Sequence, residues 1–449
     1  MPALAGEINS PENVATNLAA QALTNSAAME IITSLTTEIG PRLDGSEAEK
    51  RAAAWAQQHM EQLGFDKVWI ETFPLEHGWV RGIEKAEITS PSPQPLILTA
   101  LGGGVATPSE GLEAEIALFK TYAELLAAPA GSLTGKIAVV TQRMVRTKDG
   151  AGYSAAGKIR TAGPVEAARR GAVGYLLRSL GTDGVRRPHT GGTHYVEGVP
   201  KIPAAALSAT DAEQLERLTA LGKPVRVKMT LTPRDLGPVT SQNVIGEIKG
   251  REKPDEIILL GAHLDSWDLG TGAIDDGAGV AIVLATAKLI HDLPERPRRT
   301  IRVVLYGSEE TGLLGGKAYA KMHASELTNV VIAAEPDLGQ GPIYQFQTGV
   351  TNADEPSLKR IAAALTPLGV LPGDNLSHGE SDIEPLFEAH VPVVTLALDA
   401  SDYFDYHHTP DDTLDKIKPE RINQSTAAYA VFTYFAAELD GDYRAPAKK

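Results

Sequence analysis

The chain has 449 residues, of which 43% are hydrophobic and 22% are charged, and its formal net charge at pH 7 is −15. This length suffices for two or three soluble domains with a large core. The negative charge argues against nucleic acid or an anionic membrane as the main partner. The chain has no cysteine, which excludes disulfides and thiol catalysis, and any zinc must be bound by histidine and carboxylate groups.

The N-terminal segment, residues 1–26, is polar and is predicted to form an irregular, loosely held arm. It lacks the basic n-region and the apolar h-region of a signal peptide. No run of 18 apolar residues occurs anywhere in the chain, so no membrane span is predicted.

Residues 27–87 are predicted to form the N-terminal part of the main domain. A helix is expected over 27–39 and a turn over 40–45. Ser46 and Glu49 have the spacing of a capping box, which predicts a second helix that ends at Leu63, before Gly64. The alternating pattern of residues 67–73 predicts a strand.

Residues 88–235 differ in pattern and are predicted to form an inserted, mostly-β domain. Short strands are expected at 137–141, 174–177 and 225–232, with helices at 165–170 and after the capping box that begins at Thr210. Residues 181–198 form a long polar loop that contains arginine and histidine. Such a loop in a compact domain is functional or mobile, or it is simply solvated, and the sequence leaves both readings open.

Residues 236–449 alternate between strand and helix patterns, which predicts an α/β fold with a mixed, mainly parallel sheet flanked by helices. The expected strands cover 242–248, 256–263, 300–307, 329–335 and 392–398. The expected helices cover 278–292, 313–322, 356–368, 382–389 and 419–438.

Histidines and carboxylates stand at the end of successive predicted strands. They are His263, Asp265 and Asp275 after the second strand, Glu309 and Glu310 after the third, Glu335 and Asp337 after the fourth, and His407 and His408 after the fifth. Taken singly, each has an ordinary alternative: a packed histidine, an N-cap for Asp275, or a solvated turn for Glu309 and Glu310. Together they predict a site for two divalent cations, because clustered carboxylates repel one another unless cations hold them. This ligand set suits Zn²⁺, with Mn²⁺ or Co²⁺ as possible substitutes.

Five segments carry a resemblance to a known family: HLDSW (263–267), GAIDDGAG (272–279), GSEETGLLGG (307–316), EPD (335–337) and YHHTPDDT (406–413). They resemble the co-catalytic two-zinc aminopeptidase and carboxypeptidase family. The segments LTGKIAVV (133–140) and GVPKIPAAALS (198–208) are similar to a protease-associated domain. This combination most resembles the plasma glutamate carboxypeptidase (carboxypeptidase Q) branch, whose members act on dipeptides.

The resemblance implies a zinc exopeptidase fold and a role for each matching residue. It implies that Asp275 bridges two zinc ions and that Glu309 is the general base that activates a water shared by them. Asp265 is expected to accept a hydrogen bond from the far ring nitrogen of His263, and Glu335 to support the site. The remaining metal ligands implied by the match are His263, Glu310, Asp337 and His408, with His407 as the alternative to His408.

The substrate is less well defined than the metal site. A zinc-dependent exopeptidase of dipeptides or short peptides is the leading hypothesis, with a general aminopeptidase or a carboxypeptidase as alternatives. A receptor-like protein without activity and a glutaminyl-cyclase-like enzyme are also considered. Residues 377–382 resemble a family loop beside the site, and Arg186 and Arg187 are either partners of a substrate carboxylate or solvated. A homodimer and a periplasmic or secreted location, otherwise cytoplasmic, are also expected.

Overall fold

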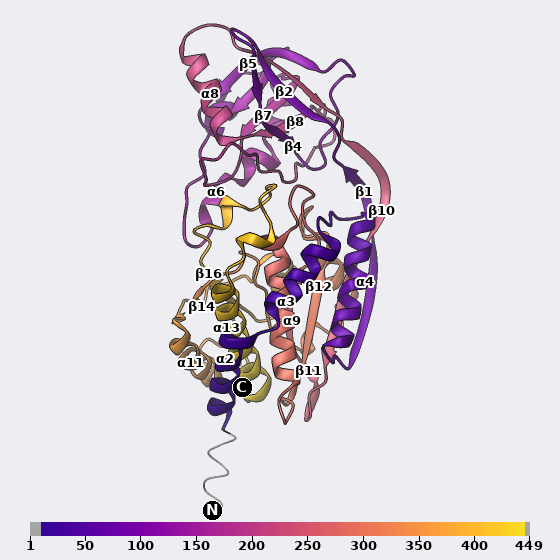
Figure 1. Cartoon of the computed structure of the whole chain (residues 1–449), viewed down its shortest axis with the longest axis vertical. Coiled ribbons are helices and arrows are strands. Elements are labelled where there is room, and N and C mark those ends of the chain that lie inside the picture. The colour runs from indigo at the N-terminus through magenta and orange to yellow at the C-terminus, as the bar shows by residue number, and fades with distance from the viewer. Residues whose placement is uncertain (1–9, 445–449) are drawn as a thin grey trace, which may run out of the picture.

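The structure, a computed structural model, describes residues 10–444. In Figure 1 these residues form two lobes that are stacked along the long axis of the molecule, each built around an eight-stranded sheet. The lower lobe contains residues 10–80 and 234–444, and the upper lobe contains residues 84–231. Among the described residues, no helix is long and apolar enough to cross a membrane.

The segment predicted to be an irregular arm contains a helix, α2 (Pro11–Asn25). The Ser10 side chain accepts a hydrogen bond from the third residue of the helix, and Pro11 occupies its first turn, as is typical of helix starts. Leu18 and Ala22 are buried where α2 packs on α13 (Pro419–Glu438). The prediction was wrong because the few apolar side chains of this segment are buried only by contact with α13, which lies about 400 residues later in the chain. Residues 1–9 lie outside the described part of the chain.

The next elements largely follow the predicted pattern. The first predicted helix is α3 (Ala28–Ser34), continued by a wider turn (Leu35–Ile39), and the capping-box helix is α4 (Glu47–Gln62). The Ser46 hydroxyl accepts from the Glu49 amide at 3.1 Å, while the Glu49 carboxylate accepts from the Gly45 amide at 2.7 Å. The capping box is therefore confirmed, with the returning bond made to Gly45.

The sheet of the lower lobe is mixed, which confirms the predicted α/β class. Its strand order is β1-β10-β12-β11-β13-β16-β14-β15, and the four strands β12, β11, β13 and β16 are mutually parallel. The sequence missed β14 and β15. The strands are β1 (Lys67–Val80), β10 (Arg234–Ile248), β11 (Lys253–His263), β12 (Arg299–Tyr306), β13 (Val330–Ala334), β14 (Ile343–Gly349), β15 (Leu371–Pro372) and β16 (Val393–Leu398).

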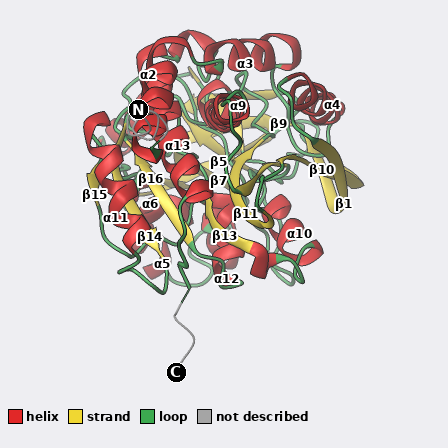
Figure 2. Ribbon diagram, turned by 90° about the horizontal axis from the view of Figure 1, so that it is seen from below, coloured by secondary structure: helices red, strands yellow, loops and turns green. Residues whose placement is uncertain are grey.

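Helices cover both faces of this sheet, as the view in Figure 2 shows. Ile258 and Leu260 of β11 pack in one core with α9 (Ala278–His291), whereas Ile257 and Leu259 pack in another with residues of α10 (Leu314–Met322) and α12 (Glu384–Glu388). The alternation arises because successive side chains of a strand point to opposite faces. The remaining helix of this lobe is α11 (Pro356–Leu365).

The sheet of the upper lobe has the strand order β3-β2-β9-β5-β6-β7-β8-β4. In chain order, the first strand of this lobe begins at Glu84 and the last ends at Leu231. Helices lie between the strands, and β5 to β8 are parallel, so the lobe is mixed α/β, and the prediction of a mostly-β domain was wrong. The elements are β2 (Glu84–Ser90), β3 (Gln94–Leu96), β4 (Leu98–Ala100), β5 (Leu112–Phe119), α5 (Tyr122–Ala127), β6 (Ile137–Val140), α6 (Ala151–Thr161), α7 (Gly163–Arg169), β7 (Gly174–Arg178), β8 (Ala204–Leu207), α8 (Ala209–Ala220) and β9 (Arg226–Leu231). The sequence missed several of these elements, including α6.

The lobes are joined by an antiparallel ladder and by side-chain contacts. Strands β1 and β10 pair from Lys67 with Glu247 to Val80 with Arg234, so the same two strands lead into and out of the upper lobe. Arg81 forms an ion pair with Asp268 of the lower lobe at 2.7 Å. Both side chains are largely shielded from water, so this ion pair is weakened less by solvent and salt than an exposed pair would be.

A close approach of Gly102 to Trp267 gives a test of this lobe contact. A Cβ at position 102 would lie 1.9 Å from the Trp267 ring. Gly102→Ala should therefore lower the free energy of unfolding by about 1–3 kcal/mol, the usual cost of overpacking. Urea titration followed by tryptophan fluorescence would measure this change. Gly157→Ala is the control, because its Cβ would meet no atom within 4 Å and its unfolding curve should not shift to lower urea. Equal unfolding free energies for Gly102→Ala and the parent would contradict the expected clash.

Candidate metal centre

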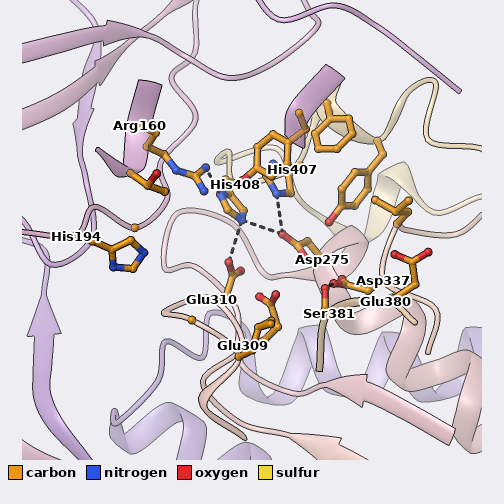
Figure 3. A pocket seen from close by; sticks show the side chains of 18 residues that line it. Arg160, His194, Asp275, Glu309, Glu310, Asp337, Glu380, Ser381, His407 and His408 are labelled. Carbon is orange, nitrogen blue, oxygen red and sulfur yellow. Dashed lines mark hydrogen bonds and ion pairs between the residues drawn. The ribbon is translucent and has the colours of Figure 1, made fainter. Parts of the chain in front are cut away.

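The parallel strands bring the predicted site residues to one edge of the lower sheet. His263 is the last residue of β11, Glu309 and Glu310 follow β12, and Asp337 follows β13. Because the carboxyl ends of parallel strands share one edge, these side chains meet there, where ligands bind in open α/β sheets. Figure 3 shows most of them around a pocket between the lobes.

One half of the cluster surrounds His263. The Nε2 atom of His263 lies 3.1 Å from Oδ1 of Asp275 and 3.3 Å from Oδ1 of Asp337. All three residues are buried. One imidazole nitrogen and two carboxylates thus converge in a space the size of a metal coordination shell.

The other half of the cluster surrounds His408. Its Nε2 atom lies 2.9 Å from Oε2 of Glu310 and 3.2 Å from Oδ2 of Asp275 (Figure 3). Asp275 therefore presents one carboxylate oxygen to each histidine. It precedes α9 and has non-helical backbone angles. Asp275 is not the N-cap of α9, which is Gly277. The neighbouring Asp276 supports the start of the helix instead, because its carboxylate accepts from the Gly279 amide at 3.0 Å.

The cluster fits a divalent cation by two observations. Oδ2 of Asp275 and Oδ1 of Asp337 are buried without a hydrogen bond and face histidine nitrogens, and a buried carboxylate oxygen is costly when no hydrogen bond or cation satisfies it. The ligand atoms within each of the groups Asp275–His407–His408 and His263–Asp275–Asp337 also lie within 4.8 Å of one another. Imidazole nitrogen and carboxylate oxygen are ligands that zinc accepts in tetrahedral or five-coordinate sites.

The electrostatics of the cluster reflect a surplus of negative charge. Burial alone would lower the pKa of His408, but Glu310 and Asp275 outweigh it and raise this pKa to about 9. Burial raises the pKa of Glu309 well above its usual range, and Asp337 and Glu310 add to the rise. Protonation thus offsets the surplus of negative charge, a role that a bound cation would take over.

Asp265 differs in part from its expected role. His263 Nδ1 lies 3.0 Å from the main-chain carbonyl oxygen of Asp265 and 3.7 Å from its carboxylate. The carboxylate instead accepts from the amides of Glu309 at 3.0 Å and Glu310 at 3.3 Å. Asp265 therefore orients His263 chiefly through its backbone and holds the turn that carries Glu309 and Glu310 through its side chain.

His407 and His408 occupy different positions in the site. Their rings stack with centroids 3.5 Å apart, but His407 Nε2 is 3.6 Å from Asp275, farther than His408 Nε2. Burial lowers the pKa of His407 well below its usual range, with a further contribution from His408. His407 also packs against the rings of Tyr153 and Phe404. The geometry favours His408 as the ligand and His407 as a stacked neighbour.

Arg186 and Arg187 are occupied within the chain, which argues against the suggestion that they bind substrate. Arg186 pairs with Asp211 at 3.0 Å, and Arg187 pairs with Asp183 at 2.9 Å and with Asp411. Neither is among the residues that line the pocket. The suggestion rested on charge alone, and charge does not show whether an arginine already has a partner.

The sequence missed the upper wall of the pocket. The cavity has a volume of about 270 Å³, and its upper wall includes Arg160 of α6 and His194. Arg160 is only 9% exposed, and its Nε atom is buried without a hydrogen-bond partner. Glu380 and Ser381 lie on the other side of the cluster, so that part of the expected loop 377–382 does line the site (Figure 3). No local motif marked Arg160, because only the packing of the two lobes brings it there.

Comparison with known proteins places these features in a family. Residues 243–433 match peptidase family M28. Carboxypeptidase Q of Homo sapiens is 34% identical over 94% of this chain and 88% of its own length. Aminopeptidase YwaD of Bacillus subtilis is 25% identical over 92% of this chain and 85% of its own length.

Solved structures show the same architecture. A peptidase M28 precursor from Shewanella amazonensis has a TM-score of 0.94 and 50% identity, over 98% of this chain and 99% of that one. A zinc aminopeptidase from Bacillus subtilis has a TM-score of 0.65 at 21% identity, over 92% and 95% of the two chains, which shows a shared fold. Fold, site and relatives together define a metallo-exopeptidase. The chain belongs to peptidase family M28.

Metal removal tests the cluster directly. Because a ligand that binds only the folded state stabilises it, zinc at 100 times its Kd should raise the free energy of unfolding by about 2.7 kcal/mol. Urea unfolding with added zinc and with a chelator would measure the difference. Asp275→Asn should abolish the response to zinc, since both halves of the cluster use this carboxylate. Superimposable curves for the parent protein in zinc and in chelator would rule out a cation site here.

Proposed function

We propose that this protein is a dipeptidase that uses two zinc ions, one held by His263, Asp275 and Asp337 and the other by Asp275, Glu310 and His408. The observation that carries the proposal is the Asp275 carboxylate, which offers one oxygen to each histidine-containing half of the cluster. A carboxylate placed in this way suits a bridge between two ions. Both ions would lie at the floor of the cavity between the lobes.

Zinc, when bound, supplies a Lewis acid that polarises the scissile carbonyl and lowers the pKa of water toward about 7. Glu309 borders the cavity, and its side chain belongs to neither half of the cluster. Its carboxylate is therefore free to take the proton from the attacking water and to return it to the leaving amine. The bonds from the Glu309 and Glu310 amides to Asp265 hold the turn that carries both residues. In this turn Glu310 faces His408 in the cluster, whereas Glu309 borders the cavity.

Replacement of Glu309 separates catalysis from metal binding. Glu309→Gln should retain zinc, because the amide replaces a group that is not a ligand. Dipeptide hydrolysis should fall about 100- to 10,000-fold, the usual contribution of a general base. Zinc content and turnover would be measured on the same preparation. A variant that keeps near-normal turnover, or that loses zinc, would show that Glu309 has another role.

The substrate follows from the polar groups of the cavity walls. Arg160 is the charged group on one side of the cluster, beside His194, whose pKa burial lowers. Glu380, whose pKa burial raises to about 8, lies on the other side (Figure 3). A free dipeptide has a carboxylate at one end and an ammonium group at the other, and a cavity of about 270 Å³ suits a substrate of that size. The unpartnered Nε of Arg160 supplies a donor for the carboxylate. Arg160 thus takes the role that the sequence had suggested for Arg186 and Arg187.

A pair of substrates tests this orientation. With alanyl-alanine, Arg160→Gln should lower kcat/KM about 10- to 100-fold, because a hydrogen bond to a charged group contributes about 1.5–3 kcal/mol. With alanyl-alaninamide, which has no carboxylate, parent and variant should be equally slow. Arg169→Gln, which removes an exposed arginine paired with Glu166, is the control and should match the parent on both substrates.

Three results would contradict the dipeptidase assignment. Equal hydrolysis of the amide and the free dipeptide by the parent protein would remove the role of the substrate carboxylate. Rapid removal of the first residue from a tripeptide would favour a general aminopeptidase. Release of ammonia from an N-terminal glutamine without peptide cleavage would instead indicate a cyclase.

The same proposal extends to domain organisation, assembly and location. Residues 84–231 form a separate sheet and are proposed to be an inserted domain of the protease-associated type, somewhat shifted from the expected 88–235. Export to the periplasm or beyond is proposed because one solved relative is described as a precursor. The homodimer stays a prediction from the resemblance.

A further inference from the structure

The long polar loop of the upper lobe lies against the loop that carries the two neighbouring histidines. We name residues 181–190 the docking loop and residues 403–412 the histidine loop. The first comes from the upper lobe and the second follows β16 of the lower lobe. Of the two readings that the sequence left open, a solvated loop does not fit residues 189–190, because His189 and Thr190 are both buried.

Side chains of the docking loop hold the histidine loop at several points. Arg187 donates to the carbonyl oxygen of Asp405 at 2.7 Å and pairs with Asp411. The Thr182 hydroxyl donates to the Asp405 carboxylate at 2.7 Å. Within the docking loop, Asp183 pairs with Arg187 at 2.9 Å, which fixes the guanidinium in place. The contacts of Arg187 and Thr182 thus join the two lobes, and Asp183 holds the Arg187 side chain in position for its contacts.

Further bonds reach the histidines themselves. His189 Nδ1 donates to the carbonyl oxygen of His407 at 2.8 Å. The Thr190 amide donates to the carbonyl oxygen of His408 at 3.0 Å, and Nδ1 of the His408 ring donates to the Thr190 carbonyl oxygen at 3.2 Å. His408 is therefore held by Thr190 at both its backbone and its ring.

This ring contact decides which nitrogen of His408 can bind a metal. Nδ1 also lies 3.4 Å from Nη1 of Arg160, but the Thr190 carbonyl oxygen is nearer and only accepts hydrogen bonds, so the proton of a neutral His408 ring resides on Nδ1. Nε2 then keeps its lone pair, and it is Nε2 that faces Glu310 and Asp275. Contacts of this kind to the far nitrogen of a histidine ligand orient the ring and fix its tautomer.

The backbone of His408 also needs outside support. Its φ angle is +62°, in the left-handed region that residues other than glycine rarely adopt. Such a conformation persists only where surrounding contacts hold it. The two bonds from Thr190 and the contacts of Arg187 and His189 on either side supply this support.

We propose that the docking loop positions His408 for metal binding, so that the Asp275–Glu310–His408 half of the centre depends on contact between the lobes. The inference rests on the proposed two-zinc function. The other half, made by His263, Asp275 and Asp337, lies entirely within the lower lobe and receives no bond from the docking loop among the described residues. The two metal positions therefore differ in what holds them.

Two adjacent arginines provide the test. Arg187→Gln removes contacts to the histidine loop, whereas Arg186→Gln removes a pair with Asp211 inside the upper lobe. Zinc content and the two dissociation constants would be measured by competition with a chromophoric chelator on the full-length proteins. In Arg187→Gln one ion should bind about 10-fold or more weakly, within the range known for such supporting contacts, and the other should be unchanged. In Arg186→Gln both ions should bind within about 2-fold of the parent.

A second variant guards against a general loss of structure. Thr182→Val keeps the shape of the side chain but removes its bond to Asp405, and it should weaken the same single ion. Circular dichroism and urea unfolding would verify that all variants are folded. Parental affinity for both ions in Arg187→Gln and Thr182→Val, or equal weakening of both ions, would overturn the proposal. A parent protein that binds fewer than two ions would instead remove the two-zinc function on which the proposal rests.

Discussion

The organising constraint of this protein is the crowding of buried carboxylates at one edge of the lower sheet. Asp265, Asp275, Asp276 and Asp337 are all 8% exposed or less. Like charges in so dry a place raise one another's proton affinity, and Asp276 shows this: burial raises its pKa well above the usual range, and Asp337 and Asp275 contribute to the rise. A fold concentrates acids in this way only when something positive balances them, and metal ions do so with the fewest atoms.

The surroundings of the cluster are arranged to keep the acids in place. Arg42 is fully buried nearby, yet it donates to the main-chain oxygens of Leu264, Thr271 and Gly272 rather than to a carboxylate. It shapes the loop between β11 and α9, and its charge acts on the acids at a distance. Burial lowers the pKa of Arg42, while Asp412 and Asp265 oppose the change. Arg42 therefore leaves the acids to their histidine neighbours and to ions instead of pairing with them.

The sequence predicted the parts of the site that depend on local pattern. His263, Asp275, Glu310 and Asp337 follow recognisable strands, and parallel strands must end at a common edge, so their meeting could be anticipated. Arg160 could not, because it lies on an unpredicted helix and reaches the pocket only through the stacking of the lobes. The prediction of an irregular arm at residues 11–25 was wrong for a similar reason, because the apolar side chains of this helix are buried against α13. Local signals fixed the identity of the candidate ligands, while distant packing determined what surrounds them.

The partner of the His408 ring is a main-chain oxygen, that of Thr190. Every amino acid has this atom, so no exchange of the side chain at position 190 deletes it. A shift of the loop by a single residue, through an insertion or a deletion, would move it away from the ring. The contact at position 190 is therefore insensitive to the identity of the side chain and sensitive to the length of the loop. Among related chains, the docking loop should keep its number of residues even where the residue at position 190 differs.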